Sequence, residues 1–331
     1  MKMAFFEVQG WEKEMLAKAF PDALLIEEKL TEENADTYAD VEIISCFIYS
    51  SCSKIILDKL PKLTYVATRS TGYDHIDVAY AATKRITVSN VPEYGSRTVA
   101  EFTFALILNL TRKIYQAVNQ AKQFNFDHPL IRGVDLYGKT LGIVGLGKIG
   151  GEVLKIAQGF GMKALVSTRS EKKELLAIYD MEFVELDELL TRSDIVTLHL
   201  PSMKDTYHII NKENIMKMKK KSYLVNTARG GLIDIEAVIL GLENGILEGV
   251  ALDVLEEENE MGEEVNILSK DYKEKMDFKT LFLNHVLMNN PKVIITPHNA
   301  FNSEEALLRI TETTIFNIQE FSQGRMANLV F

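Results

Sequence analysis

The stretch Thr140-Leu-Gly-Ile-Val-Gly145-Leu-Gly147-Lys-Ile-Gly150 is the most informative part of the chain. An apolar, β-branched run leads into three glycines and then into a helical pattern. This spacing suits a tight turn, a close approach of ligand to backbone, and close packing of helix on strand. It predicts a strand–turn–helix unit whose helix N-terminus binds the phosphates of a dinucleotide. The residues expected at the phosphates are Gly145, Gly147, Lys148, Ile149 and Gly150.

Short apolar runs alternate with amphipathic stretches on both sides of this loop. The alternation predicts an α/β fold with parallel sheets and crossover helices. The expected strands are Lys2–Glu7, Ile43–Tyr49, Tyr65–Thr68, Ile86–Asn90, 140–144, 163–168, 182–184, 195–199, 222–226, 249–252 and 293–296. Helices are expected at 11–19 and 53–59.

Capping signals place three further helices. Thr98-Val99-Ala100-Glu101 has the form of a capping box, which predicts one long helix from residue 98 to about Gln123. Phe102 to Leu110 are apolar nearly all round, so this helix is expected to be buried on several sides. Asp234 is the expected N-cap of a helix ending near Gly245, and Ser303 that of a C-terminal helix.

Composition bounds the class of protein. With 331 residues, 47% of them hydrophobic and 25% charged, the chain is long enough for two globular domains. The net charge of -10 disfavours nucleic acid and anionic membranes as partners. Two cysteines, Cys46 and Cys52, are too few for a disulfide framework or a four-ligand zinc site, so no metal is expected. The chain shows neither a signal peptide nor a membrane span, so we expect a soluble cytoplasmic protein.

The residues after the second strand of the glycine-loop unit bear on the choice of dinucleotide. Enzymes that use NAD usually carry an acidic residue there, which binds the ribose hydroxyls. This chain has Thr168, Arg169 and Ser170 instead. A guanidinium flanked by hydroxyls suits a 2′-phosphate, so NADP is favoured over NAD. The alternative is that Arg169 lies over the adenine or in solvent.

Four further blocks make a resemblance specific. They are Thr68-Arg-Ser-Thr-Gly72-Tyr-Asp-His-Ile-Asp77, Asn90-Val-Pro-Glu-Tyr94, Asn226-Thr-Ala-Arg229-Gly-Gly and Thr296-Pro-His298-Asn-Ala-Phe301, and Ala251-Leu-Asp253-Val-Leu-Glu-Glu-Glu258 fits too. Together they span nearly the whole chain. The chain resembles the D-isomer-specific 2-hydroxyacid dehydrogenases, most closely the D-lactate dehydrogenase branch.

The resemblance implies a catalytic set of Arg229, Glu258 and His298. A planar guanidinium suits the carboxylate and carbonyl of a 2-oxo acid. His298 would give the proton that reduction requires, and Glu258 would favour its charged form. Alternatives remain for each residue: Arg229 could cap a turn, Glu258 could be a solvated acid like its two neighbours, and His298 could be an ordinary loop histidine.

The resemblance also implies binding residues. Backbone amides of Thr71 and Gly72 would hold the substrate carboxylate, and Tyr94 and Phe301 would line a small pocket, with core packing as the alternative. Asp253 would bond the nicotinamide carboxamide or, alternatively, cap the end of a strand. Thr227 and Ala228 would also contact the cofactor. His75, His128, His199, His208 and His285 lack a comparable setting.

The implied architecture is two Rossmann-like α/β domains facing a cleft. Residues 1–100 and 299–331 would form a discontinuous, flavodoxin-like substrate domain, and residues 101–298 the NAD(P)-binding domain. The expected substrate is pyruvate, with glyoxylate, hydroxypyruvate or a bulkier 2-oxo acid as the alternatives. The long apolar helix favours a homodimer. A non-catalytic dinucleotide-sensing co-repressor is the alternative of another class, because fold alone does not fix function.

Overall fold

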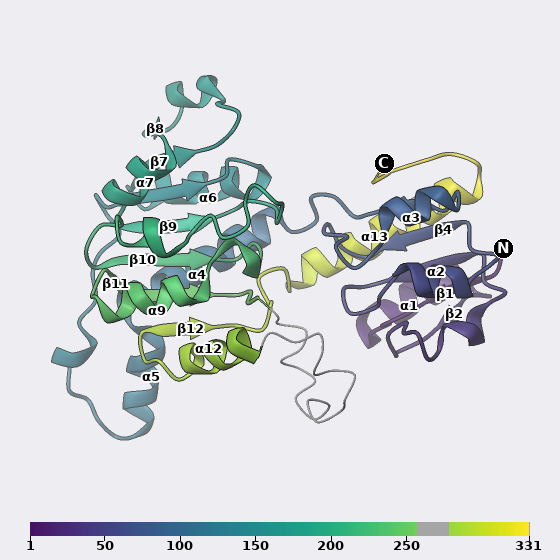
Figure 1. The fold of residues 1–331 in the computed structure, drawn as a ribbon, viewed down its shortest axis with the longest axis horizontal. Helices are drawn as coiled ribbons and strands as arrows, with labels where there is room; N and C mark the ends of the chain where they lie inside the picture. Colours follow the sequence, from purple (N-terminus) through teal and green to yellow (C-terminus); the bar gives the residue numbers. More distant parts are fainter. Residues whose placement is uncertain (257–277, 331) are drawn as a thin grey trace. The chain divides into compact units, whose positions relative to one another are not determined.

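The computed structural model describes residues 1–256 and 278–330. They form two compact units, one of Met1–Gly95 with Asn302–Phe331 and one of Ser96–Phe301 (Figure 1). The sequence places the divisions after residues 100 and 298. Each unit is an α/β domain built on a parallel sheet, so the predicted fold class is confirmed.

The sheet of the first unit has the strand order β2-β1-β3-β4-β5 among the described residues, with all pairs parallel. This is the flavodoxin-like order. The strands are β1 (Met3–Phe5), β2 (Leu24–Leu25), β3 (Ile43–Cys46), β4 (Tyr65–Thr68) and β5 (Thr87–Ser89). The helices are α1 (Gly10–Ala19), the 3-10 turn η1 (Ala35–Tyr38), α2 (Lys54–Lys59), α3 (Val78–Thr83) and α13 (Glu304–Ser322).

Three predicted strands of this unit are too long: Ile86–Asn90 by one residue at each end, and Lys2–Glu7 and Ile43–Tyr49 for one shared physical reason. Glu7 has φ of 58°, so β1 ends before it. Its carboxylate accepts from the amides of Phe47 at 3.0 Å, Tyr49 at 2.9 Å and Ser50 at 3.0 Å. Those amides are therefore not available to the ladder, and β3 ends at Cys46 instead of Tyr49. The two-residue strand β2 carries too short a pattern to be predicted.

The C-terminal helix completes the first unit. Ser303 caps α13 as predicted, since its hydroxyl accepts from the amide of Ala306 at 3.2 Å. The helix packs against α1 and β4. Tyr65 on β4 stacks on Phe321 with ring centroids 4.1 Å apart.

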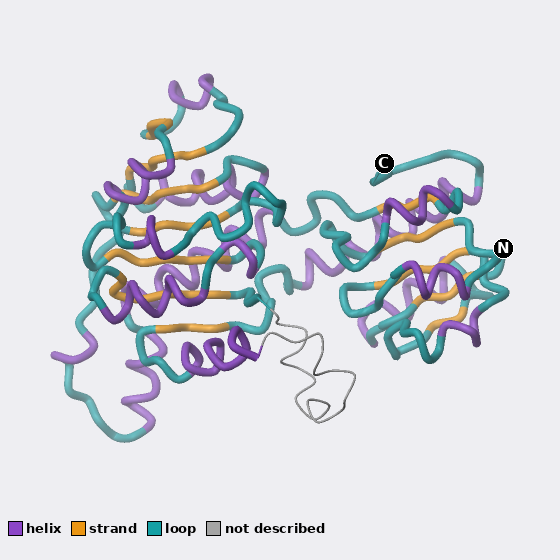
Figure 2. The backbone as a smooth tube through the Cα atoms, in the orientation of Figure 1, coloured by secondary structure: helices purple, strands orange, loops and turns teal. Residues whose placement is uncertain are grey.

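The sheet of the second unit has the order β12-β11-β10-β9-β6-β7-β8 within the described part of the chain, again all parallel. Figure 2 shows its strands, in orange, side by side. The strands are β6 (Thr140–Val144), β7 (Lys163–Ser167), β8 (Met181–Phe183), β9 (Ile195–Leu198), β10 (Ser222–Asn226), β11 (Leu247–Leu252) and β12 (Val293–Ile295). All seven are predicted, with ends that differ by a few residues. The strand order reverses between β6 and β9.

Helices cover both faces of this sheet (Figure 1). The helices and 3-10 turns of this unit are α4 (Ser96–Arg112), α5 (Ile114–Lys122), η2 (Pro129–Ile131), α6 (Lys148–Gly159), η3 (Lys173–Ala177), α7 (Leu186–Arg192), α8 (Lys212–Ile215), η4 (Gly230–Leu232), α9 (Ile235–Glu243) and α12 (Phe278–Met288). Successive strand residues serve opposite faces: Leu224 belongs to one buried cluster and Val225 to the other. Asp234 caps α9 as predicted, accepting from the amide of Glu236 at 2.9 Å.

The prediction of one long helix from residue 98 to residue 123 is wrong in two respects. It is two helices, because Lys113 has φ of 51° and breaks the chain between α4 and α5. It also begins at Ser96, so Thr98 lies inside α4 and is not its cap. The carboxylate of Glu101 accepts from Nε of Arg97 at 2.7 Å, one turn away, instead of closing a capping box. As expected, α4 is largely buried, against α6, β10 and β11.

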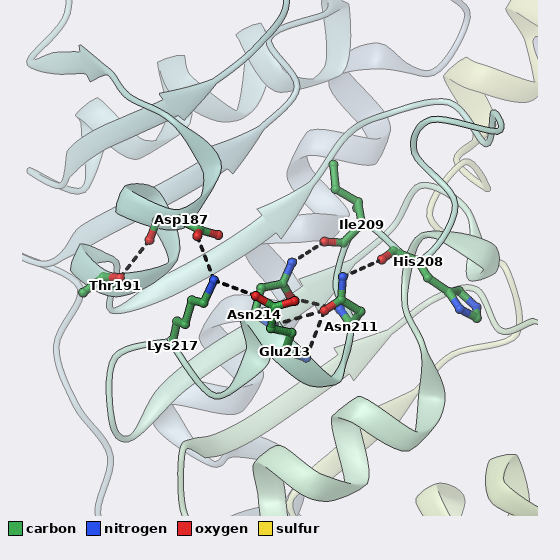
Figure 3. A network of polar contacts seen from close by, with 8 residues as sticks. All are labelled: Asp187, Thr191, His208, Ile209, Asn211, Glu213, Asn214 and Lys217. Carbon is green, nitrogen blue, oxygen red and sulfur yellow. Dashed lines mark hydrogen bonds and ion pairs between the residues drawn. The ribbon is translucent and has the colours of Figure 1, made fainter.

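Short helix α8 is capped by a network that also holds the residues before it (Figure 3). Asn211 accepts from the amides of Glu213 at 3.0 Å and Asn214 at 3.1 Å. Asn211 Nδ2 donates back to the carbonyl of His208 at 3.3 Å, and Asn214 Nδ2 to that of Ile209 at 2.7 Å. The network therefore fixes the backbone of residues 208 and 209. None of the helices described is long and apolar enough to span a membrane.

Candidate active site

The glycine loop joins β6 to α6, as predicted. Gly145 has φ of +100°, and a Cβ there would lie 2.6 Å from the carbonyl oxygen of His199. A Cβ on Gly150 would lie 2.1 Å from the carbonyl oxygen of Gly145, so the first turn of α6 packs directly on loop backbone. A Cβ on Gly147 would meet no atom within 4 Å. The loop therefore has no room for a side chain at Gly145 and Gly150, whereas the backbone at Gly147 is open to a ligand.

The N-terminus of α6 fits the phosphates of a dinucleotide. Its N-cap is Gly147, which has no side chain to accept from the first amides of the helix. Lys148 is exposed and Ile149 half-buried just after it. The loop also lies where the strand order reverses, at the carboxyl ends of β6 and β9. Open α/β sheets bind ligands at such points, and helix N-termini bind anions.

The two neighbouring glycines of α6 give a matched test of this loop. Gly150→Ala is expected to weaken NADH binding and to lower the melting temperature, because its Cβ would overlap the Gly145 carbonyl. Gly151→Ala meets no atom within 4 Å and is expected to keep binding and to stabilise α6 by about 0.5–1 kcal/mol. Fluorescence titration and thermal denaturation measure both. Equal NADH affinity in the two variants would contradict the role given to Gly150.

The segment of Thr168, Arg169 and Ser170 lies beside the glycine loop. The amide of Gly145 donates to the carbonyl of Ser167, the last residue of β7, at 2.8 Å. Thr168 is half-buried, whereas Arg169 and Ser170 are exposed. Within residues 1–256 and 278–330, no hydrogen bond or ion pair engages the Arg169 guanidinium. The guanidinium is thus available to an anion bound near the loop.

Arg229 lies after β10 in a loop shaped by Asn226. Asn226 Oδ1 accepts from the amide of Ala228 at 3.0 Å, and its Nδ2 donates to the carbonyl of Arg229 at 2.8 Å. The half-buried guanidinium donates from Nη1 to the carbonyl of Ala228 at 2.7 Å. Thr227 is buried, with its hydroxyl 2.9 Å from that of Thr103 on α4. The backbone that carries Arg229 is therefore fixed on its N-terminal side.

Asp253 follows β11 and holds the loop that carries His298. Its buried carboxylate accepts from the hydroxyl of Thr296 at 2.5 Å and from the amides of Asn299 and Ala300, both at 2.8 Å. Its carbonyl accepts from the amide of His298, also at 2.8 Å. Burial raises the pKa of Asp253, and the three hydrogen bonds to its carboxylate offset part of that rise. Asp253 acts as the strand-end cap, with one carboxylate acceptor position left over.

His298 is held in an unusual backbone conformation. Its φ is 49°, in the left-handed region that costs a non-glycine residue roughly 1–3 kcal/mol. Such residues persist only where their surroundings fix them, and they cluster at functional sites. The four hydrogen bonds that Asp253 accepts from this loop provide that constraint. The ring of Phe301 lies edge-on to the imidazole, with centroids 6.3 Å apart.

Three of these residues reach the same edge of the sheet. Asn226 pairs with Leu252, and Leu252 with Ile295, so the carboxyl ends of β10, β11 and β12 lie side by side. The loops of Arg229, Asp253 and His298 start from these ends. Glu258, the carboxylate expected beside His298, lies outside the described residues.

His199 is also near this edge but has a different character. Burial lowers the pKa of His199 to about 3, so its imidazole is neutral at physiological pH. Nε2 lies 3.0 Å from the hydroxyl of Thr197, and the buried Nδ1 has no partner among the described residues. A histidine of this kind does not supply a proton near neutral pH.

The predicted substrate residues of the first unit lie in loops after β4 and β5. The hydroxyl of Thr71 donates to the carbonyl of Val91 at 2.7 Å, and the carbonyl of Gly72 accepts from the hydroxyl of Ser70 at 2.5 Å. No acceptor within the described ranges is bonded to the amides of Thr71 and Gly72. Tyr94 is half-buried, and its carbonyl accepts from the guanidinium of Arg309 on α13 at 2.7 Å.

The sequence of the second unit decides the family. Residues 104–300 match the sequence profile of the D-isomer specific 2-hydroxyacid dehydrogenase, NAD binding domain. The chain belongs to the D-isomer-specific 2-hydroxyacid dehydrogenase family. This dehydrogenase is therefore an oxidoreductase that acts on CH–OH groups, and its glycine loop lies inside the matched NAD-binding domain.

Relatives of this dehydrogenase cover nearly its whole length. It is 39% identical to the aromatic 2-oxoacid reductase of Clostridium sporogenes (84% of this chain, 82% of that one) and 36% identical to the glyoxylate reductase of Thermofilum pendens (89% and 82%). The crystal structure of D-lactate dehydrogenase from Aquifex aeolicus, complexed with NAD and lactic acid, superposes with a TM-score of 0.88 at 34% identity, covering 99% of both chains.

The sequence of this dehydrogenase offers Asp253 as a strand-end cap, but it does not predict which residues Asp253 and Asn226 bond to support the catalytic loops. The signal for Asn226 is local, because an Asn at a strand end readily bonds the backbone two residues on. The loop-holding role of Asp253 has no comparable signal, because its partners lie 43 to 47 residues away in the chain. Within the described residues, no group of three acidic, cysteine or histidine side chains is placed to hold a metal ion.

Proposed function

We propose that this dehydrogenase reduces a small 2-oxo acid to the D-2-hydroxy acid, with pyruvate as its first substrate. The observation that carries the proposal is the His298 loop, held by Asp253 at the same sheet edge as Arg229. Reduction of a 2-oxo acid needs a proton donor and an anion-binding cation together. The bound lactic acid named for the Aquifex aeolicus protein supports pyruvate.

In this proposal each residue has one task. Arg229 binds the substrate carboxylate and carbonyl through its forked donors, and the amides of Thr71 and Gly72 hold the carboxylate. His298 holds the proton that passes to the carbonyl oxygen, and in the reverse direction it accepts that proton. Glu258 favours the imidazolium form of His298. The nicotinamide, when bound, supplies the hydride.

The remaining predicted residues are proposed to shape the two binding sites. Tyr94 and Phe301 limit the size of the substrate, which favours pyruvate, glyoxylate or hydroxypyruvate over bulkier 2-oxo acids. Thr227, Ala228 and the spare acceptor position of Asp253 face the cofactor. Because an aromatic 2-oxoacid reductase is among the relatives, an aromatic 2-oxo acid is the competing substrate to test.

A panel of 2-oxo acids assayed with NADH and NADPH tests the proposal. We expect the highest kcat/KM with pyruvate and lower values with glyoxylate and hydroxypyruvate. A clear preference for phenylpyruvate would move the substrate to the aromatic class. Tight NADH binding without oxidation by any 2-oxo acid would instead favour the co-repressor alternative.

We also propose that the enzyme accepts NADPH. The support is the exposed Arg169 between two hydroxyl residues, where an acid would repel a 2′-phosphate. The prediction is a kcat/KM with NADPH at least equal to that with NADH, and a selective loss for NADPH in Arg169→Ala, because only NADPH carries the 2′-phosphate. Steady-state kinetics with both cofactors measure this. Much better use of NADH by the wild-type enzyme would refute it.

We propose a homodimer as well. No residue of α5 is buried, and the segment after it exposes Phe124 by 89% and Phe126 by 71%. Exposed apolar side chains that lie together in one segment are typical of a protein–protein interface. Sedimentation at micromolar concentration is expected to give twice the chain mass of 37.4 kDa, and Phe124→Glu to shift the protein toward the monomer. A monomeric wild-type protein would contradict the proposal. The cytoplasmic location stays a prediction.

A further inference from the structure

Glu256, the last described residue before 257–277, has both carboxylate oxygens bound. The hydroxyl of Tyr207 donates to Oε1 at 2.8 Å, and Nε2 of His208 lies 3.2 Å from Oε2. The rings of Tyr207 and His208 stack with centroids 3.9 Å apart and planes 17° apart. Asn284 on α12 donates to the carbonyl of Glu256 at 2.9 Å. We call Tyr207, His208 and Glu256 the carboxylate clamp.

The backbone of His208 is fixed independently of Glu256. Its φ is 48°, again in the strained left-handed region. Its amide donates to the carbonyl of Gly231 at 2.8 Å, and its carbonyl accepts from Asn211 at 3.3 Å. Figure 3 shows the imidazole pointing away from the Asn211 network. The ring is thus directed to its partner by the loop that carries it.

The carboxylate clamp lies against the residues that follow Arg229. A Cβ on Gly230 would lie 2.2 Å from the carbonyl carbon of Leu255 and 2.3 Å from the amide nitrogen of Glu256. The two backbones are therefore in direct contact, and Gly231 bonds His208. Asn226 fixes the loop before Arg229, and the clamp fixes the loop after it.

We propose that the carboxylate clamp positions Arg229 for substrate binding. The inference rests on the proposed function, because that assigns the substrate carboxylate to Arg229. A purely structural role predicts little effect on activity, because partly exposed polar contacts of this kind contribute only about 0–1 kcal/mol to stability. Misplacing a substrate-binding group by about 1 Å costs up to 100-fold in rate. The two roles therefore differ in what they predict for activity.

Four variants test the clamp. Glu256→Ala removes both contacts, Glu256→Gln keeps an acceptor for Tyr207, and Tyr207→Phe removes one hydroxyl. Glu243→Ala, at the exposed end of α9, is the matched control. The readouts are the melting temperature, the Kd for NADH, and kcat and KM with the best 2-oxo acid.

Glu256→Ala is expected to lower kcat/KM by on the order of 10- to 100-fold, mainly through KM for the 2-oxo acid, with the Kd for NADH unchanged. Glu256→Gln is expected to recover most of the loss. An active wild type with equal kcat/KM in Glu256→Ala and Glu243→Ala would overturn the clamp alone. A wild type inactive with every 2-oxo acid would overturn the proposed function and the clamp together. If Glu256→Ala does not fold, Tyr207→Phe decides: a higher KM for the 2-oxo acid than in the wild type supports the clamp, and an unchanged KM overturns it.

Discussion

Replacing His298 by asparagine is expected to lower kcat for reduction of the 2-oxo acid by about 10²- to 10⁴-fold. The imidazole is the proposed proton donor, and no amide can take over that step. Asparagine tolerates positive φ better than most residues, so the loop at φ 49° is expected to keep its conformation. Steady-state kinetics at saturating cofactor measure the effect. His298→Ala should lose at least as much activity.

The control for this variant is His285→Ala, which removes an exposed histidine on α12. It is expected to retain the wild-type kcat. The Kd for NADH should be the same in all three proteins, because the glycine loop is elsewhere in the unit. A His298→Asn enzyme with near wild-type turnover would remove His298 from the mechanism.

Truncating Arg229 to alanine is expected to reduce kcat/KM by about 10²- to 10⁴-fold. Two charge-assisted hydrogen bonds to the substrate would be lost, each worth roughly 1.5–3 kcal/mol, and every 1.4 kcal/mol is a factor of about ten. Arg229→Lys keeps the charge but not the planar fork, so its loss should be intermediate. Kinetics with pyruvate and titration with NADH separate substrate binding from cofactor binding.

Arg192→Ala is the matched control for this second variant. Arg192 is an exposed arginine on α7 that pairs with Glu182 and Glu188, and its loss should leave kcat/KM unchanged. Added guanidinium ion is expected to restore part of the activity of Arg229→Ala. An Arg229→Lys enzyme as efficient as the wild type would show that no forked contact is made.

The sequence predicted the sheets well because their signals are local. Each signal lies within a few consecutive residues: an apolar run predicts a strand, a glycine pattern predicts a turn, and a residue such as Asp234 or Ser303 predicts the start of a helix. The start of α4 was mispredicted because Glu101 pairs with Arg97 instead of with the residue that resembles its cap. The break at Lys113 has no local signal, since lysine seldom adopts positive φ.

In the candidate site, too, features with a local sequence signal were predicted and features that depend on distant contacts were not. Motifs placed Arg229 after β10 and His298 after β12, where loops of a parallel sheet carry function. The supports of these residues are contacts between distant segments: Asp253 with the loop of Thr296, and Glu256 with Tyr207. Pairings across 43 and 49 residues leave no periodic pattern in a single sequence. These contacts depend on how the fold brings the loops together, so only the three-dimensional structure shows them.

The configuration of the product decides whether this protein reduces a small 2-oxo acid to the D-2-hydroxy acid. Purified protein is incubated with pyruvate and NADH or NADPH, and the lactate formed is resolved by chiral chromatography. We expect consumption of the reduced cofactor and formation of one D-lactate for each molecule of cofactor consumed. Formation of L-lactate, or of no 2-hydroxy acid from pyruvate, glyoxylate or hydroxypyruvate, would contradict it.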